Sequence, residues 1–331
     1  MESEAKSKAY WDKIISTYGT PSTVKSILQV VNTVVPFVIT SYLMYLSLEY
    51  SYFLTLALSV IAGGLVIRFF VIQHDCGHGS FFSKKKANDI LGRVLSAITM
   101  TPYAQWAKEH NMHHATSGSL DNRGVGDVTT MTVKEYKSSS KIGKIWYRIY
   151  RNPFFLFTVG AFAHFIVKQR IPFYKTKKLS SWISVMSTNI YMIAVVVSLS
   201  LWIGFVPLMK MYIPVVILAS SIGTWLFYLQ HQYEDTYWEK GHDWNYYEAA
   251  IKGSSFYNLP RILHWFSGNI GYHHIHHLSS KIPNYNLPRC YAENQILQTW
   301  PVKMNIIESF KCMRMALWDE DNKKMISFKD L

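Results

Sequence analysis

Eight histidines fall into three short clusters whose spacing is typical of metal ligands. The first cluster is His74 and His78, the second is His110, His113 and His114, and the third is His273, His276 and His277. Residues three or four apart share one face of a helix, so each cluster can present its imidazoles in one direction. Eight imidazoles exceed the needs of one ion. The sequence therefore predicts two ions with about four imidazoles each.

The identity of the metal follows from the ligand type. Imidazole suits iron, zinc, copper and nickel. A structural zinc site is four-coordinate and rich in cysteine, whereas the cysteines of this chain are only three and are not paired in sequence: Cys76, Cys290 and Cys312. An all-histidine set that oxygen can reach favours iron on chemical grounds.

The composition limits the kind of protein that carries these clusters. The chain has 331 residues, of which 49% are hydrophobic and 17% are charged, against about 25% charged in an ordinary soluble domain. Such hydrophobicity excludes disorder, and three cysteines exclude a disulfide scaffold. The formal charge of +13 suits either nucleic acid or the anionic cytoplasmic leaflet. The long apolar runs favour the membrane, and no nucleic-acid partner is expected.

Four apolar runs are long enough to cross a bilayer, which takes about 20 residues. They cover 28–48, 52–73, 182–205 and 211–229, and the only charged residue among them is Arg68. Arg68 lies near one end of its run, so we expect it to reach the headgroups. The runs form two close pairs. The predicted fold is therefore an all-α polytopic membrane protein with four transmembrane helices in two hairpins.

Two shorter apolar segments, 90–104 and 153–167, are expected to lie along the membrane interface. Each has about 15 residues, which is short for a crossing. Basic residues flank or enter both segments: Lys84, Lys85, Lys86, Arg93, Lys141, Lys144, Arg148, Arg151, Lys168, Arg170, Lys175, Lys177 and Lys178. The positive-inside rule therefore places both ends of each segment in the cytoplasm, and the turns 49–51 and 206–210 outside.

This topology brings the histidine clusters to one side of the membrane. The stretches 74–181 and 230–331 are then a cytoplasmic helical cap at the mouths of the spans, and the whole chain, 1–331, is one domain. All three clusters lie in that cap.

The order and spacing of the clusters resemble a known family. HxxxH, HxxHH and HxxHH between paired spans resemble the three histidine boxes of membrane fatty acid desaturases. The stretches 70–82, 105–127, 148–154, 223–235, 253–259, 268–287 and 317–328 resemble Bacillus acyl-lipid desaturases, of the kind that place a Δ5 bond in phospholipid chains. The resemblance covers nearly the whole chain.

The resemblance implies a set of ligands. It matches the eight clustered histidines to the boxes and adds His231, at the end of the last span, so that nine histidines would hold two irons. Animal stearoyl-type enzymes carry an asparagine four residues before that histidine, which holds a water on one metal. Here Phe227 occupies the position, which puts that water in doubt.

Two carboxylates and two further histidines lie close to the clusters in sequence. Asp75 and Asp127 are expected to orient ligand imidazoles, as carboxylates near metals do. His264 and His274 are expected outside the ligand set, although spacing alone leaves both open.

The resemblance also implies the reaction. O2 is the co-substrate, two hydrogens leave adjacent methylenes, and a cis double bond forms in the acyl chain of a membrane lipid. No His-Pro-Gly-Gly haem segment is present, so the electrons are expected from an external donor, ferredoxin or flavodoxin. The expected location is the plasma membrane, multi-pass, with the active site on the cytoplasmic side.

Two alternatives remain at this point. A related hydroxylase or ketolase, acting on alkyl or carotenoid substrates, uses the same boxes. If the chain were a metal transporter or sensor, histidines would be expected inside the spans. None of the four runs contains one. The double-bond position and the oligomeric state are not encoded in these patterns.

Overall fold

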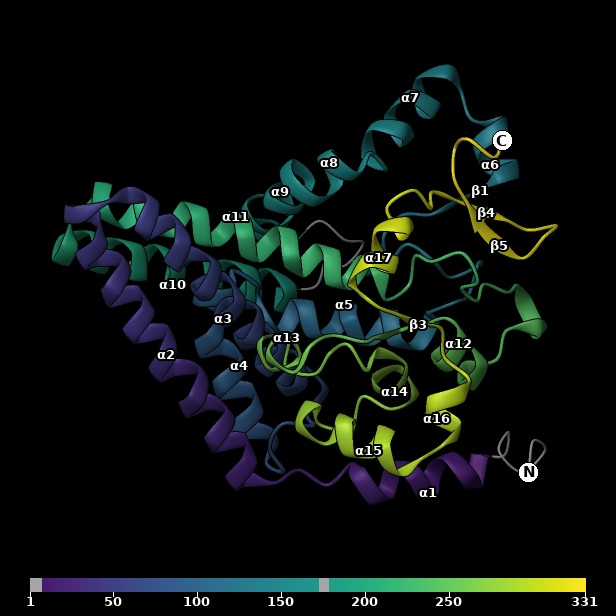
Figure 1. Ribbon diagram of the computed structural model, residues 1–331, viewed down its shortest axis with the longest axis horizontal. Helices are drawn as coiled ribbons and strands as arrows, with labels where there is room; N and C mark the ends of the chain where they lie inside the picture. The colour runs from purple at the N-terminus through teal and green to yellow at the C-terminus, as the bar shows by residue number, and fades with distance from the viewer. Residues whose placement is uncertain (1–7, 173–178) are drawn as a thin grey trace.

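The computed structural model describes residues 8–172 and 179–331. Its four longest helices are α2 (Thr23–Tyr50), α3 (Tyr52–His78), α10 (Leu179–Ile203) and α11 (Phe205–Leu229), and all four are long and apolar enough to cross a membrane. They form two hairpins, α2–α3 and α10–α11 (Figure 1). The predicted membrane fold is confirmed.

The spans differ from the prediction at their ends. Helix α3 continues to His78, so the first histidine cluster lies on the spanning helix itself. The predicted outer turn at 206–210 is wrong, because α11 already begins at Phe205. The chain reverses at Gly204, whose φ of +89° belongs to the region that favours glycine. A single residue, Ser51, separates α2 from α3.

The two shorter apolar segments are helical and lie against the spans. The first is α4 (Lys85–Thr99), which packs on α3. The second is built from α8 (Pro153–Phe155), the π-helical turn η2 (Leu156–Gly160) and α9 (Ala161–Ile166), which pack beside α11. Among the described residues neither segment reaches the length of a span. The basic residues Lys175, Lys177 and Lys178 lie outside the described residues, and the depth of both segments in the bilayer stays a prediction.

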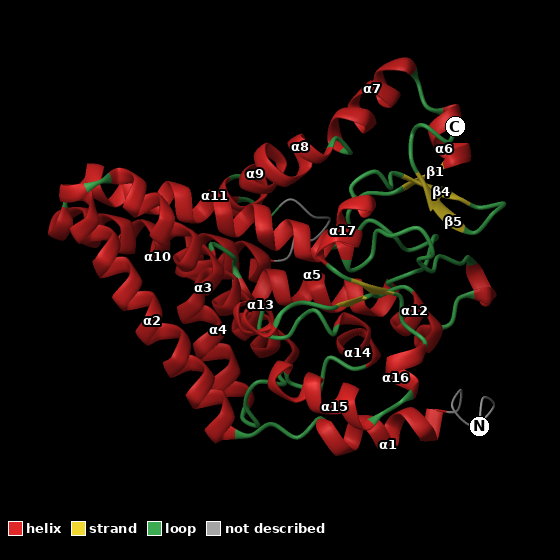
Figure 2. Cartoon of the chain, viewed as in Figure 1, coloured by secondary structure: helices red, strands yellow, loops and turns green. Residues whose placement is uncertain are grey.

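The remaining helices form a cap at one end of the hairpins (Figure 2). They are α1 (Lys8–Tyr18), α5 (Tyr103–Thr116), α6 (Val133–Ser138), α7 (Lys141–Tyr150), η3 (Lys168–Arg170), η4 (Gly241–Asp243), α12 (Tyr246–Lys252), α13 (Arg261–Phe266), α14 (His273–Leu278), η5 (Asn284–Asn286), α15 (Leu287–Glu293), α16 (Ile296–Thr299) and α17 (Ile306–Cys312). Trp11 and Ile14 of α1 pack with Leu278 and Leu287 in one buried cluster. This cluster ties the N-terminal helix to α14 and α15.

Within residues 8–172 and 179–331, five strands of two or three residues add to the otherwise helical fold. A three-stranded sheet has the order β1 (Met131–Thr132), β4 (Leu317–Asp319) and β5 (Lys324–Ile326), with β1 parallel and β5 antiparallel to β4. β2 (Phe256–Tyr257) pairs in parallel with β3 (Lys303–Met304). These short pairings fasten the C-terminal segment to the cap.

The position of the Arg68 side chain differs from the prediction. It does not reach the headgroups, because it is only 5% exposed. Its Nε donates to Thr33 Oγ1 at 3.0 Å, its Nη2 donates to Asn32 Oδ1 at 3.2 Å, and its Nη1 donates to the Trp265 carbonyl. A buried guanidinium needs such acceptors. Arg68 therefore joins α2 and α13 to α3.

Helix α4 packs so closely on α5 that one methyl group is expected to destabilise the contact. A Cβ at Gly92 would overlap the ring of Tyr103 at Cε2. The tyrosine ring cannot withdraw, because its hydroxyl donates to the Cys76 carbonyl at 2.8 Å. We expect Gly92→Ala to cost about 1–3 kcal/mol and to lower the midpoint of thermal unfolding in detergent. The matched control is Gly223→Ala, since a Cβ there meets nothing within 4 Å. Equal midpoints for both variants would contradict the prediction.

Candidate metal centre

The histidine clusters meet at one end of the two hairpins. His74 and His78 come from the last turn of α3, and His231 follows the end of α11 by two residues. The second cluster comes from α5 and the third from α14. Four elements thus converge on one site, as the topology requires. All nine rings are buried except that of His78, which is half-buried.

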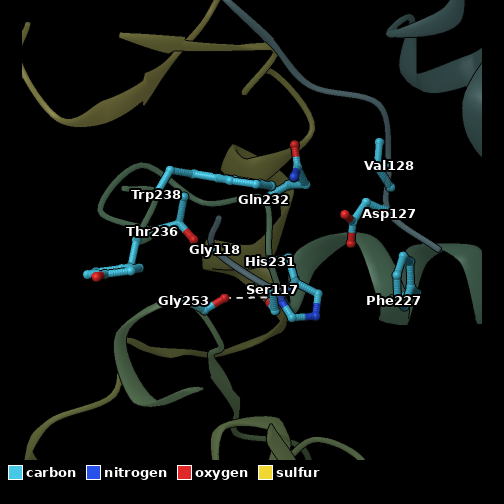
Figure 3. A pocket seen from close by; sticks show the side chains of 11 residues that line it. Ser117, Gly118, Asp127, Val128, Phe227, His231, Gln232, Thr236, Trp238 and Gly253 are labelled. Carbon is cyan, nitrogen blue, oxygen red and sulfur yellow. Dashed lines mark hydrogen bonds between the residues drawn. The ribbon is translucent and has the colours of Figure 1, made fainter. Parts of the chain in front are cut away.

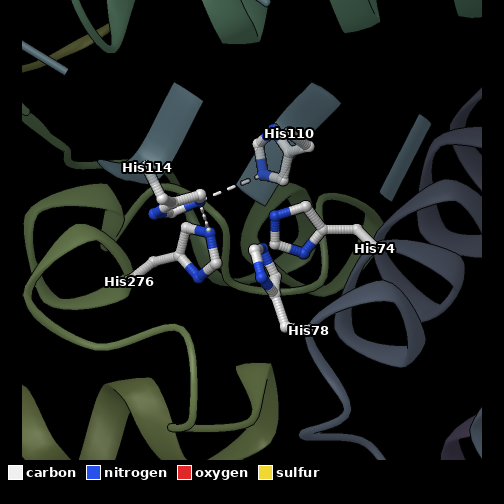
Figure 4. A group of neighbouring side chains, drawn as sticks. All are labelled: His74, His78, His110, His114 and His276. Carbon is white, nitrogen blue, oxygen red and sulfur yellow. Dashed lines mark hydrogen bonds between the residues drawn. The ribbon is translucent and has the colours of Figure 1, made fainter. Parts of the chain in front are cut away.

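Five of the rings form a first group. His74, His78, His110, His114 and His276 each place a ring nitrogen within 4.8 Å of the others. Figure 4 shows these five side chains pointing toward a common centre. His114 Nε2 lies 3.1 Å from His110 Nε2 and 2.9 Å from His276 Nε2. This group can hold one metal ion.

Three more rings form a second group, and a fourth adjoins it. His113, His231 and His277 place their ring nitrogens within 4.8 Å of one another. His273 Nε2 lies 3.0 Å from His231 Nε2, so it extends this group. The His114 and His277 rings stack with centroids 4.1 Å apart. The two groups therefore adjoin, and together they contain all nine histidines of the expected set.

Hydrogen bonds on the outer side of the rings fix the direction of four of them. His74 Nδ1 donates to Asp75 Oδ1 at 3.0 Å, and His78 Nδ1 donates to Asn111 Oδ1 at 2.8 Å. His113 Nδ1 donates to Asp127, and His231 Nδ1 donates to the Gly253 carbonyl at 2.9 Å.

The tautomer follows from these partners. Carboxylate, amide and carbonyl oxygens accept, so the proton sits on Nδ1 of each of these four rings. Nε2 then carries the lone pair and faces the group, which is how metal-binding histidines are held.

The two aspartates also connect the rings to other segments. Asp75 Oδ2 accepts from the backbone N–H and the side-chain amide of Asn284, at 2.7 and 2.8 Å. Asp127 Oδ2 accepts from the Gly124 N–H at 3.3 Å. Each carboxylate thus anchors a ring of the site to a loop that follows one of the histidine-bearing helices.

The donor set fits a metal. Nε2 of His78 and of His277 is buried without a hydrogen-bond partner among the described residues, and an unpaired buried polar atom is costly. The nitrogen separations of 2.9–3.2 Å match two ligands at about 2.1 Å from one ion and at right angles to each other. A metal in each group would supply the missing partner.

The electrostatics also favour metal binding. Burial lowers the pKa of His231 to about 3. Burial first, and neighbouring imidazoles second, hold the pKa of five further rings well below the usual value: His110, His114, His273, His276 and His277. These rings are therefore neutral near pH 7, the form that binds a metal.

A small, partly open pocket adjoins the second group (Figure 3). Asp127, Phe227 and His231 line it, together with the indole of Trp238. The Phe227 ring lies 5.4 Å from the His113 ring and 5.7 Å from the His231 ring, centroid to centroid. A phenyl ring offers no hydrogen bond to a water. The structure therefore provides no polar side chain at the position that is asparagine in the animal enzymes.

The other histidines lie outside both groups. His274 is fully buried, with Nε2 3.0 Å from the Leu297 carbonyl. His264 Nε2 accepts from the Leu259 N–H at 3.3 Å, and His164 pairs with Gln169. The His242 side chain is 96% exposed. The structure thus separates His264 and His274 from the site, as expected.

Two partners of the rings were not predicted. Asn111 lies inside the second cluster, but no spacing rule distinguishes it from its neighbour Met112. The Gly253 carbonyl is a backbone group, so the residue type at this position does not indicate a contact with His231.

Asp127→Asn tests the orientation of His113. The amide keeps the shape of the carboxylate but loses its charge and presents an N–H where the ring needs an acceptor. Loss of such a partner typically costs 10–100-fold in metal affinity or activity, and we expect turnover per chain to fall in that range. Turnover and bound iron are measured on the same preparation. Asp321→Asn, at an exposed turn, is the control, and wild-type turnover in Asp127→Asn would contradict the role.

Comparison with known proteins agrees with this geometry. Residues 51–301 match the fatty acid desaturase family. The chain is 43% identical to a fatty acid desaturase of Bacillus subtilis (strain 168), over 96% of this chain and 90% of that protein. It is 29% identical to an sn-1 acyl-lipid omega-3 desaturase (ferredoxin) of Nostoc sp. (strain 36), over 66% of this chain and 61% of that protein. It is 28% identical to an sn-1 oleoyl-lipid 12-desaturase of Synechocystis sp., over 70% of this chain and 65% of that protein.

The chain belongs to the fatty acid desaturase family. The family match covers all the histidine-bearing segments together with α3, α10 and α11, and the Bacillus relative aligns with 96% of the chain. The protein is therefore a desaturase, an oxidoreductase that acts on fatty acyl chains.

Proposed function

We propose that this protein is an O2-dependent acyl-lipid desaturase that introduces a cis double bond into the acyl chains of membrane phospholipids. The observation that carries the proposal is the meeting of two imidazole groups at the same end of both hairpins. An alkyl substrate in the bilayer reaches a site there without leaving the membrane. Relatives named as acyl-lipid desaturases support the lipid substrate.

The nine histidines would hold two irons. His74, His78, His110, His114 and His276 would hold one, and His113, His231, His273 and His277 would hold the other. Bound iron supplies the O2 chemistry that removes two hydrogens from adjacent methylenes.

The protein itself positions the metals and lines the site with aromatic rings. Asp75 and Asp127 hold His74 and His113 through their Nδ1 atoms, so that Nε2 faces inward. Trp106 stacks on His110 with centroids 4.6 Å apart and meets Phe70 edge to face at 5.2 Å. Unactivated methylenes offer no polar handle, so an apolar wall of this kind has to place them.

The remaining parts of the proposal concern location and electrons. The site faces the cytoplasm of the plasma membrane, because the turns at the other end of the hairpins, Ser51 and Gly204, carry no basic residue, whereas basic residues flank the segments near the site. The two electrons needed per turnover come from an external donor, ferredoxin or flavodoxin. The name of the Nostoc relative includes ferredoxin, and an acidic donor suits a chain of net charge +13.

The proposal is tested by expression in a host whose lipids are fully saturated, with a ferredoxin and its reductase supplied. We expect unsaturated phospholipids, and mass spectrometry then locates the double bond. His113→Ala, expressed to the same level, is the inactive control. Hydroxylated chains would indicate the related hydroxylase instead. Only saturated chains, despite good expression and an active donor, would contradict the proposal.

A further inference from the structure

Helix α7 carries an exposed apolar stripe that neither the spans nor the metal site explain. Ile142 is 68% exposed, Ile145 is 58% exposed and Trp146 is 65% exposed, and Ile149 is exposed as well. Their spacing of i, i+3, i+4 and i+7 puts all four on one face of the helix. Side chains of this size are rarely exposed together unless they meet a partner.

The opposite face of α7 is fixed to the cap, which sets the direction of the stripe. Tyr147 is buried with Tyr136 and Leu317. Its hydroxyl donates to the Ala316 carbonyl at 2.5 Å and accepts from the Met131 N–H at 2.9 Å. Helix α7 therefore cannot roll its apolar residues inward without losing these contacts.

A basic flank runs beside the apolar stripe. Residues of an α-helix are offset by about 100° each, which places Lys141, Lys144 and Arg148 together on one side of the stripe. None of the three forms an ion pair with a described carboxylate. Lys144 donates to the Lys137 carbonyl at 2.7 Å, and Arg148 Nε donates to the Tyr136 hydroxyl at 2.7 Å. No described carboxylate neutralises their charges, although the Arg148 guanidinium also lies over the Phe328 ring, 4.5 Å from its centroid.

The stripe continues into a surface that already faces lipid. Figure 1 shows α7, α8 and α9 as one bent arm that ends beside α11. Along this arm Phe154 and Val159 are exposed, as are Ile213 and Ile217 on α11. The sequence has no acidic residue between Glu135 and Glu234. The arm and the span thus form one apolar and basic surface.

We infer that α7 lies on the cytoplasmic surface of the bilayer, with its apolar stripe among the acyl chains and its basic flank at the phosphates of anionic lipids. This contact extends the interfacial segment predicted at 153–167 by one helix toward the N-terminus. It also joins the sheet β1–β4–β5, which packs on α7, to the membrane. The inference concerns the membrane contact of the cap and does not depend on the proposed reaction.

The test places a nitroxide at Ile145→Cys in the full-length protein, reconstituted in vesicles of phosphatidylcholine and phosphatidylglycerol. The three native cysteines are buried. Asp321→Cys is the matched control, because its side chain is 75% exposed at the turn between β4 and β5. We expect collisions with O2 to exceed those with a water-soluble nickel complex at position 145, and the reverse at position 321.

Two outcomes would overturn the inference. Nickel access at position 145 equal to that at position 321 would show that the stripe faces water. Exclusion of both reagents from position 145 would show that protein covers it, as in a dimer. Neither measurement depends on catalysis, so the inference can fail while the proposed function holds.

The basic flank is tested separately with Lys141→Glu combined with Lys144→Glu. In vesicles that contain phosphatidylglycerol, nickel access at position 145 is expected to rise at least threefold. In phosphatidylcholine alone it is expected to rise less, because the attraction to anionic lipid is absent. No change in the anionic vesicles would overturn the assignment of this flank to lipid phosphate.

Discussion

Replacing His231 by alanine is expected to abolish desaturation and to release iron from the second group. His231 Nε2 lies 3.2 Å from His113 Nε2 and 3.0 Å from His273 Nε2, so its loss removes the ring that links the other two. The ring is also held by the Gly253 carbonyl on its outer side, which shows that its inward direction is set by the fold. We expect turnover below detection, and the same for His113→Ala. Iron per chain and desaturated lipid are measured together.

Two other histidines provide matched controls for this experiment. His242→Ala removes a side chain that is 96% exposed, and it should leave iron and turnover unchanged. His274→Ala removes a buried ring that contacts Leu297 instead of the site. It is expected to lower stability but to leave iron per folded chain unchanged. Retained turnover in His231→Ala would remove that residue from the ligand set.

The spans and the histidine clusters could be predicted because both are local properties of the chain. A run of about 20 apolar residues is visible without any knowledge of its neighbours. Likewise, the i, i+3 and i+4 spacing of His273, His276 and His277 puts them on one helical face wherever the helix lies. His274, one position away, turns toward Leu297 as the same geometry requires.

The errors arose where distant segments decide the outcome. Arg68 has no local partner, and its acceptor Trp265 lies 197 residues away in sequence. The sequence around Arg68 therefore led to the wrong prediction that its side chain reaches the headgroups. The second outer turn was predicted at 206–210, but only Lys210 is polar in that stretch. The chain reverses instead at Gly204, whose positive φ ends α10, and α11 begins at Phe205.

The division of nine histidines into two groups was likewise beyond the sequence. Spacing assigns rings to helices but not to ions, and the second cluster contributes to both groups. His110 and His114 join the first group, whereas His113 joins the second. Only the crossing of α5 between α3 and α14 decides this division, and that crossing is a tertiary property.

Removal of iron is expected to inactivate the enzyme completely and to loosen the cap. Purified protein should contain about two irons per chain, one for each group. A strong chelator leaves buried imidazole nitrogens without a partner, such as Nε2 of His78 in the first group and Nε2 of His277 in the second. A metal held at a thousand times its dissociation constant stabilises the folded state by about 4 kcal/mol. The thermal midpoint should therefore fall by something of the order of 10 °C.

Reloading with different metals separates the structural part of this effect from the catalytic part. Fe(II) should restore both the midpoint and the turnover. Zn(II) should restore the midpoint alone, because it binds imidazole but has no redox chemistry. The Gly92→Ala variant gives the matched comparison, since its deficit relative to the wild type arises from packing against Tyr103 and should persist whichever metal is loaded. Full turnover after iron has been removed would contradict the metal centre, since no other buried cluster of the described residues offers a comparable set of ligands.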